Sequence, residues 1–294
     1  MTSNNKLNTD TILKNDCISL NISESASKPS TNELLSDDCL FVILGYVSLL
    51  DLLTVTNVCK SWRKIASQYI HKKSYFDLTS LLFHFYPMLS SSNPPIYSEE
   101  LHTVQILYKF PALKSISLKN HTKLSTPNTF ISTFIENFSS NSLKSLDFSG
   151  HSEINLWNNI NLIQKFNTNF PNLQVINLSK TLINDSSINE FISHKNIQSI
   201  DISYCKNITF SSIYKLISAS NFTKLKCSHN PNLKHHFKYT FKPTNAHNSM
   251  SMRSHSTQSS LNLTGCVNLR SFSMNSELLS RCNRFHTINL NNCV

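Results

Sequence analysis

A short phrase of apolar residues recurs along this 294-residue chain from residue 113 to the C-terminal end. The phrase has a large apolar residue, two variable positions, a second apolar residue, one variable position and a third apolar residue. The first five copies start 30, 30, 24 and 25 residues apart. A repeat of this period predicts a stack of similar structural units. Complete copies begin at Leu113, Leu143, Leu173, Ile197, Phe222 and Phe285, and a partial copy contains only Leu261 and Leu263.

Each copy of the phrase predicts a short strand, because its last two apolar residues alternate with variable ones and so point to one face. Between the phrases, apolar residues recur at helical spacing over residues 130–138, 188–192 and 213–217. One strand and one helix per unit, when stacked, bury a common core that no single unit can bury alone. The predicted fold class is therefore α/β, with a solenoid over residues 111–294.

The eighth position beyond each phrase start is expected to lie in the turn after the strand. Proteins with similar repeats place in this turn a residue that is able to satisfy buried backbone groups. We expect the cysteines at this position to be reduced, buried thiols that act as small hydrophobes. The earlier copies, which carry other residues, are expected to be degenerate. The position holds Cys205, Asn230, Cys266 and Cys293 in the later copies and His121, His151 and Thr181 in the earlier ones.

Residues 33–66 form a second distinctive segment, in which twenty of the 34 residues are apolar. So short a segment cannot bury this many apolar side chains within itself. Ser36, followed by two aspartates, is expected to cap a first helix. Ser48 begins a capping-box pattern ahead of a second helix, and Thr56 or Asn57 is expected to start a third that runs to the end of the segment. The surplus of apolar side chains predicts a surface that another protein covers.

The spacing of these apolar residues resembles the F-box family, although Ser36 stands where the family usually has proline. The resemblance implies that residues 32–68 fold as a small three-helix unit. It also implies that this unit docks on the Skp-type adaptor of a Skp–cullin–F-box ubiquitin ligase. Some of the matching side chains should face the adaptor and the others should hold the helices together. These candidate adaptor-binding residues are Leu35, Leu40, Ile43, Leu44, Leu52, Leu53, Val58, Cys59 and Trp62.

The repeats point the same way, because their cysteine-containing form at residues 203–209 and 264–269 resembles the leucine-rich-repeat subclass that accompanies many F-boxes. Together the two resemblances imply the substrate receptor of the ligase, which reaches the cullin through the adaptor and holds a client protein with its repeats. Such a receptor raises effective concentration and performs no bond chemistry. Candidate client contacts, chosen only by their position on the concave strand face, are Ser115, Ser145, Asn177, Asp201 and Lys226.

The sequence contains no local signature of catalysis. Its three glycines, Gly45, Gly150 and Gly265, are too far apart for a Walker loop or a dinucleotide fingerprint. Neither His-Glu-x-x-His nor Gly-x-Ser-x-Gly occurs, and none of the eight cysteines belongs to a Cys-x-x-Cys pair. We therefore expect a non-catalytic protein that uses no metal and no cofactor.

The net charge of +10 raises nucleic acid as a partner. The basic residues are scattered, so solvated surface is the favoured interpretation. The exception is a basic insertion near residues 234–257, which contains four Lys or Arg, four His and no acidic residue. Two alternatives to a ligase receptor stay open. One is an F-box scaffold without a degradation role. The other is a repeat-based module that binds protein, or that binds RNA or another polyanion with the help of Lys234, Lys238 and Lys242.

The remaining segments complete the predicted domain organisation. Residues 1–31, rich in Asn, Ser and Thr, are expected to form a disordered arm. Residues 69–110 connect the two halves and either cap the first repeat or belong to it. No secretory leader and no apolar run of bilayer length is visible, so we expect a cytoplasmic or nuclear protein outside membranes. The chain stops at Val294 just after a strand phrase, so either another chain covers that strand or the sequence is truncated.

Overall fold

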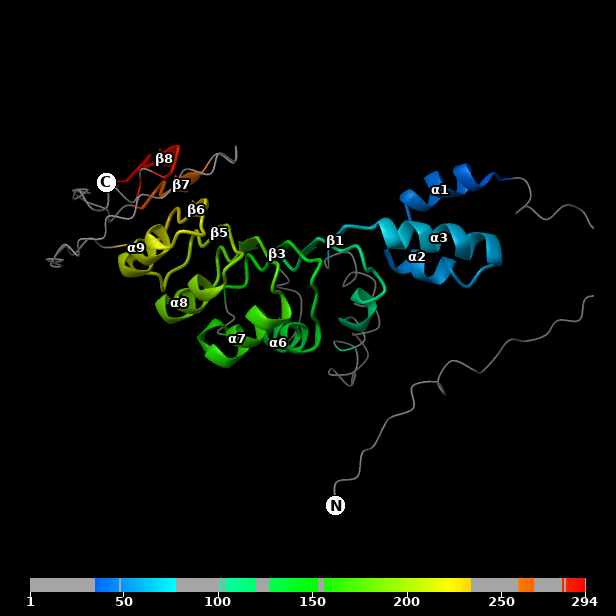
Figure 1. Cartoon of the computed structure of the whole chain (residues 1–294), viewed down its shortest axis with the longest axis horizontal. Helices are drawn as coiled ribbons and strands as arrows, with labels where there is room; N and C mark the ends of the chain where they lie inside the picture. The colour runs from blue at the N-terminus through cyan, green and yellow to red at the C-terminus, as the bar shows by residue number, and fades with distance from the viewer. Residues whose placement is uncertain are drawn as a thin grey trace, which may run out of the picture.

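The computed structural model describes residues 35–47, 49–77, 101, 104–119, 127–152, 156–233, 259–266, 282 and 284–293. Among these residues, three helices come first: α1 (Asp37–Gly45), α2 (Leu49–Val55) and α3 (Lys60–Lys72). A single parallel sheet with helices along one side follows them (Figure 1). Within the described residues, no helix is both long enough and apolar enough to span a bilayer.

Helix α1 begins where the sequence predicts. The Ser36 hydroxyl accepts a hydrogen bond from the Cys39 amide at 3.3 Å, and Asp37 and Asp38 occupy the first turn. Their negative charges favour the positive end of the helix dipole. Leu40 and Leu44, one helical turn apart, are buried together with residues of α3. This pair fixes which side of α1 faces the rest of the helical unit.

The predicted start of the third helix is wrong. Helix α3 begins at Lys60 with Cys59 as its N-cap, and it continues to Lys72, six residues beyond the predicted end. Thr56 and Asn57 instead lie in the turn that closes α2, where the Asn57 amide donates to the Thr54 carbonyl at 2.9 Å. The Arg63 Nε then donates to the Thr56 carbonyl at 2.8 Å, which ties this turn to α3. Ser48, the predicted cap of the second helix, lies outside the described residues.

The sheet contains eight parallel strands in the order of the chain, β1 to β8. Each strand is three residues long and pairs in one constant register with the strand before it. Strands β2 to β8 coincide with the seven predicted copies of the phrase, so that prediction is confirmed. The strands are β1 (Tyr75–Asp77), β2 (Ser115–Ser117), β3 (Ser145–Asp147), β4 (Val175–Asn177), β5 (Ser199–Asp201), β6 (Lys224–Lys226), β7 (Ser260–Asn262) and β8 (Thr287–Asn289).

Strand β1 was not predicted, and it lies in the segment expected to connect the two halves. Phe76 pairs with Ile116 and is 1% exposed, so it occupies the central apolar position of the phrase. By the same register Lys73 occupies the first position of the phrase. Because Lys73 is charged, a search for apolar spacing does not find this copy. The chain passes from α3 to β1 through only Lys73 and Ser74.

Helices α6 (Pro127–Asn137), η3 (Leu156–Asn158), α7 (Ile160–Asn169), α8 (Asp185–Ser193) and α9 (Phe210–Ser218) connect the strands. In Figure 1 the α-helices among them follow one another along one side of the sheet. The predicted helical segments near residues 130–138, 188–192 and 213–217 correspond to α6, α8 and α9, and α7 was missed. The described part of the chain is thus an α/β solenoid of successive strand and helix units preceded by three helices.

The core lies between the sheet and these helices. One inward-facing residue per strand is at most 1% exposed in β1 to β7, whereas Ile288 of the terminal strand β8 is 38% exposed. Aromatic rings fill the middle of the core. Phe134 and Phe170 stack with ring centroids 5.7 Å apart, and the Trp157 ring packs on Phe148 at 5.3 Å. The central strand residues are Phe76, Ile116, Leu146, Ile176, Ile200, Leu225 and Leu261.

The basic insertion predicted near residues 234–257 lies outside the described residues. The strands on either side of it are described, and they pair directly: Lys224 opposes Ser260 and Lys226 opposes Asn262. This is the same register as in the other strand pairs. The extra residues therefore leave the sheet unchanged.

Candidate functional site

Helix α1 carries an exposed apolar surface on the side away from α3. Leu35 is 41% exposed, Val42 60%, Ile43 44% and Tyr46 89%. Val42 and Tyr46, four residues apart, lie on the side of the helix opposite the buried pair Leu40 and Leu44. Ile43 flanks that side, and Leu35 lies just before the helix begins. We call Leu35, Val42, Ile43 and Tyr46 the α1 stripe.

The stripe is held in place by contacts on the other side of α1. The rings of Phe41 and Tyr69 meet edge to face with centroids 5.6 Å apart. The Tyr69 hydroxyl donates to the carbonyl of Gly45 at 3.4 Å, at the C-terminal end of the helix. An exposed ion pair joins Lys64 of α3 to Asp37 at 3.4 Å. These contacts leave the apolar stripe turned toward solvent.

The nine predicted adaptor-binding residues fall into three groups. Leu40, Leu44 and Leu52 are at most 1% exposed, so in this structure they hold the helices together and present no surface. Three others are half-buried: Leu53, Cys59 and Trp62. The exposed ones are Leu35, Ile43 and Val58, of which Val58, in the turn between α2 and α3, is 60% exposed.

Val42 and Tyr46 are exposed apolar residues that were not among the predicted adaptor contacts, although Tyr46 matches the family's spacing. They are the most exposed members of the α1 stripe. Helical spacing would have placed Val42 and Tyr46 together, because residues four apart share one side of a helix. The motif could not separate inner from outer positions, since it records apolar residues on both.

The five predicted client contacts all lie on the sheet face that points away from the helices. Ser115 and Ser145 are opposed in neighbouring strands, as are Asn177 and Asp201, and Asp201 and Lys226. Four of them are half-buried and Lys226 is exposed. The structure therefore brings these residues into two rows of one sheet face, in which Tyr75 and Val175 stand beside Ser115 and Ser145.

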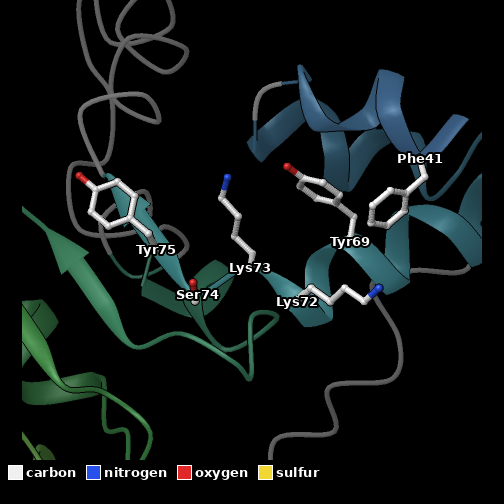
Figure 2. Close-up of a pocket in the computed structure, with 6 residues that line it drawn as sticks. All are labelled: Phe41, Tyr69, Lys72, Lys73, Ser74 and Tyr75. Carbon is white, nitrogen blue, oxygen red and sulfur yellow. The ribbon is translucent and has the colours of Figure 1, made fainter. Parts of the chain in front are cut away.

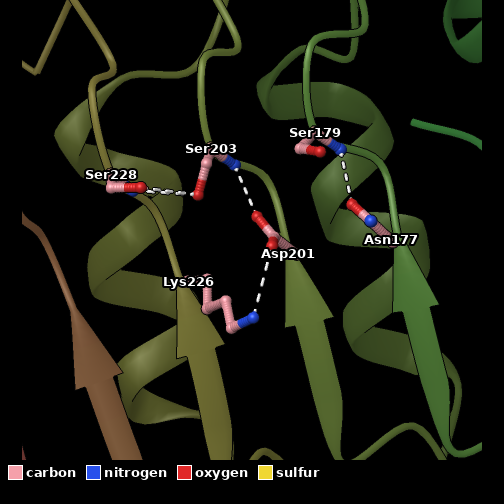
Figure 3. Close-up of polar contacts among 6 residues, drawn as sticks. All are labelled: Asn177, Ser179, Asp201, Ser203, Lys226 and Ser228. Carbon is pink, nitrogen blue, oxygen red and sulfur yellow. Dashed lines mark hydrogen bonds and ion pairs between the residues drawn. The ribbon is translucent and has the colours of Figure 1, made fainter. Parts of the chain in front are cut away.

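Two of these residues, Asn177 and Asp201, hold the turn that follows their strand, as Figure 3 shows. The Asn177 side-chain oxygen accepts a hydrogen bond from the Ser179 amide, and an Asp201 carboxylate oxygen accepts one from the Ser203 amide, each at 3.0 Å. The second oxygen of Asp201 lies 3.8 Å from the Lys226 ammonium. The same turn bond recurs with Asp147, Asn262 and Asn289. An Asp or Asn at the fifth position of the phrase was the sequence signal for this turn.

In the described units, the residue at the eighth position contacts a backbone carbonyl, as predicted; His121 lies outside the described residues. The Cys205 thiol donates to the Leu178 carbonyl at 3.2 Å, and the Cys266 thiol donates to the Cys227 carbonyl at 3.2 Å. In both cases the acceptor belongs to the preceding unit. The expectation that the earlier copies are degenerate is wrong at His151, whose Nε2 lies 2.7 Å from the Leu118 carbonyl of the preceding unit.

The buried thiols are chemically quiet. Burial raises the pKa of Cys205 and that of Cys266 to about 11, and it raises the pKa of Cys227 well above its ordinary range. Such thiols stay protonated near neutral pH, whereas nucleophiles and metal ligands are thiolates. Among the residues that the structure describes, no three His, Cys, Asp or Glu side chains come together as metal ligands would.

Comparison with known sequences gives one result for the helical unit. The F-box domain family matches residues 33–73, a span that contains α1, α2 and α3 and the whole α1 stripe. No curated protein is similar enough to the chain to count as a match. Residues 33–73 therefore form an F-box domain.

Proposed function

We propose that this chain is the substrate-recognition subunit of a Skp–cullin–F-box ubiquitin ligase. The F-box domain implies binding to a Skp-type adaptor. The observation that carries the proposal is the α1 stripe, where four large apolar side chains on α1 or just beyond its ends are 41–89% exposed. Covering apolar surface is favourable by about 25 cal/mol per Å². The adaptor is the partner whose surface covers this stripe, together with Val58.

The solenoid supplies the client-binding half of the proposal. We assign its units to the cysteine-containing leucine-rich repeats, because parallel strands, intervening helices and thiols that cap the preceding unit occur together. On the strand face, Ser115 and Ser145 are half-buried and Lys226 is exposed, and no helix among the described residues covers them. A client held there is brought close to the conjugating enzyme, and the chain contributes proximity without bond chemistry.

The adaptor surface is tested by replacing Ile43 with glutamate. Ile43 is 44% exposed, so the substitution places a charge in the interface while the core of the F-box keeps its packing. Loss of a central interface residue costs about 2 kcal/mol or more, which is roughly a 30-fold weaker complex. Binding to the purified adaptor is measured by calorimetry.

Ile160→Glu is the matched control, because Ile160 lies on helix α7 of the solenoid and is also 44% exposed. We expect this variant to bind the adaptor as the unchanged protein does. Equal binding by the Ile43→Glu and Ile160→Glu variants would remove the stripe as the docking surface. Leu40 is unsuitable for the test because it is 1% exposed, and a charge there would unfold the helices.

The receptor role needs a second readout in cells. Proteins whose ubiquitin-dependent turnover slows with Ile43→Glu, and not with Ile160→Glu, are clients. Photo-crosslinking from position 145 on the strand face should capture the same proteins, and crosslinking from Gln164, exposed on α7, should not. Adaptor binding with no such protein would identify a scaffold and contradict the receptor role.

A further inference from the structure

A pocket of about 250 Å³ opens where the F-box meets the sheet. Its lining comes from three elements: Phe41 of α1, Tyr69 and Lys72 of α3, and Tyr75 of β1, with Lys73 and Ser74 between the last two. Figure 2 shows the Lys73 side chain extending between the rings of Tyr69 and Tyr75. The volume lies below the ~300–1,000 Å³ of sites for drug-sized ligands, so it suits a group as large as one side chain.

Two ammonium groups meet this pocket without a carboxylate partner. Within the described residues, neither Lys72 nor Lys73 forms an ion pair. Each lies over an aromatic ring instead: the Lys72 Nζ is 5.1 Å from the centre of the Phe41 ring, and the Lys73 Nζ is 5.8 Å from that of Tyr69. A cation over a ring is stabilised by about 0.5–1 kcal/mol at exposed sites and still has its hydrogen-bond donors free.

Uncharged donors lie beside these lysines. The hydroxyl groups of Ser74 and Tyr75 form no hydrogen bond with any described residue, and Tyr75 is 50% exposed. The Ser74 backbone is fixed, because its carbonyl accepts hydrogen bonds from the amides of Lys114 and Ser115 at 2.8 and 3.0 Å. The pocket therefore combines two positive charges, two hydroxyl groups and aromatic walls on an anchored strand.

The helix dipole is a simpler explanation for the position of the lysines, but it explains only part of this arrangement. Basic residues in the last turn of α3 favour the negative end of the helix dipole. That effect accounts for positive charge at Lys72. It requires neither an aromatic wall nor the free hydroxyl groups of Ser74 and Tyr75, which belong to the connection and to β1.

We propose that this pocket binds the phosphorylated tyrosine side chain of a partner protein. A phosphate monoester carries a charge of about −1.5 to −2 at neutral pH. Two ammonium groups match this charge, whereas a ligand with a single carboxylate does not. The phosphate contacts Lys73 and the Ser74 hydroxyl, and Lys72, whose side chain runs toward Phe41 on the other side of Tyr69 (Figure 2), adds the second positive charge. The tyrosine ring packs against Tyr69 and Tyr75, where ring pairs gain from offset or edge-to-face contact.

The probe is the blocked amino acid N-acetyl-phosphotyrosine amide, titrated against the full chain and followed by phosphorus NMR. Blocked phosphoserine and blocked tyrosine are titrated in parallel. We expect phosphotyrosine to bind most tightly. Lys73→Gln should weaken its binding by about tenfold, the loss of one charge-assisted contact. Tyr75→Ala should reduce its advantage over phosphoserine.

Lys60→Gln is the matched control, because Lys60 is an exposed lysine at the other end of the same helix. It removes the same charge from the F-box and should leave binding unchanged. Equal weakening by Lys60→Gln and Lys73→Gln would show only a general effect of charge and overturn the proposal. Phosphoserine binding as tightly as phosphotyrosine would overturn the assignment of an aromatic ligand. The titration uses no adaptor, so its failure would leave the proposed ligase role untouched.

Discussion

At the scale of single residues, one position per unit performs one task with several chemistries. A thiol at Cys205, a hydroxyl at Thr181 and an imidazole at His151 all approach a buried backbone carbonyl. What the turn selects is a small polar group able to donate a hydrogen bond away from water. The sequence predicted the position and the task but not this equivalence, because residue type alone made the earlier copies look degenerate.

His151 makes the stability of the solenoid depend on pH. Burial lowers its pKa below the ordinary value of 6.5, against smaller opposite effects of the Leu118 carbonyl and the Asp147 charge. Between 6.5 and that lower pKa, the unfolded chain binds more protons than the folded one, so the free energy of unfolding falls as the pH falls. Urea unfolding at pH 7.5 to 5 should show this loss.

His151→Asn is the comparison, because Asn230 occupies the equivalent position in a later unit. The variant should lose stability less steeply over the same pH range. A difference in unfolding free energy between the two proteins that stays constant with pH would mean that His151 is not the source.

Gly265 is required for two separate reasons. Its φ is +70°, and a Cβ added there would lie 2.5 Å from Cδ2 of the His229 ring. The His229 ring stacks on Tyr204 with centroids 4.6 Å apart, so displacing the His229 ring would break this stacking contact. Gly265→Ala should lower the free energy of unfolding by about 1–2 kcal/mol for the backbone alone, and by more through the displaced ring.

The cost of displacing the His229 ring can be isolated with the His229→Ala variant. The free energy of unfolding is measured with denaturant for the two single variants and the double variant. In the His229→Ala background, Gly265→Ala should cost only the backbone part. A cost independent of residue 229 would show that the ring adapts freely.

At the scale of elements, helix α1 is apolar on two sides for two different reasons. One side packs on α3, and the other is the exposed stripe. The motif spacing predicted the helix and its Ser36 cap, since both are local. It could not predict which apolar residues lie inside, because that depends on how α3 packs. The start of α3 was misplaced for a related reason: Thr56 and Asn57 are good caps by type, yet the turn after α2 uses their backbone.

The two sides of α1 should respond differently to truncation. Leu44→Ala removes a fully buried side chain and should cost about 2–5 kcal/mol. Ile43→Ala, at the neighbouring position, should change stability by about 0.5 kcal/mol or less. Amide hydrogen exchange in α1 and α3 measures both. Similar protection in the two variants would contradict the assignment of inner and outer faces.

Strands were more predictable than the helices between them. Seven of the eight carry the apolar phrase, and the period of two that places a strand residue inward is fixed by the backbone. The exception, β1, is recognisable only through its pairing with β2, because Lys73 replaces the first apolar residue. Helix α7 was missed although Leu162, Ile163 and Phe166 are buried on one face.

At the scale of the whole molecule, the F-box and the sheet are joined with almost no intervening chain. Helix α3 ends at Lys72 and β1 begins at Tyr75. The Ser74 carbonyl between them is hydrogen-bonded into the edge of β2. If the proposed partners bind the α1 stripe and the strand face, this short, hydrogen-bonded connection is the covalent link between their two sites.

The strand order has a consequence for how such a chain changes over evolutionary time. Each strand is bonded only to the strands before and after it, and the joint between β6 and β7 is the same as the others despite its long connection. Duplication or loss of one unit leaves every other joint intact. Each such event lengthens or shortens the sheet by about 4.8 Å. The length of the solenoid can thus change by one unit at a time, through duplication or loss of repeats.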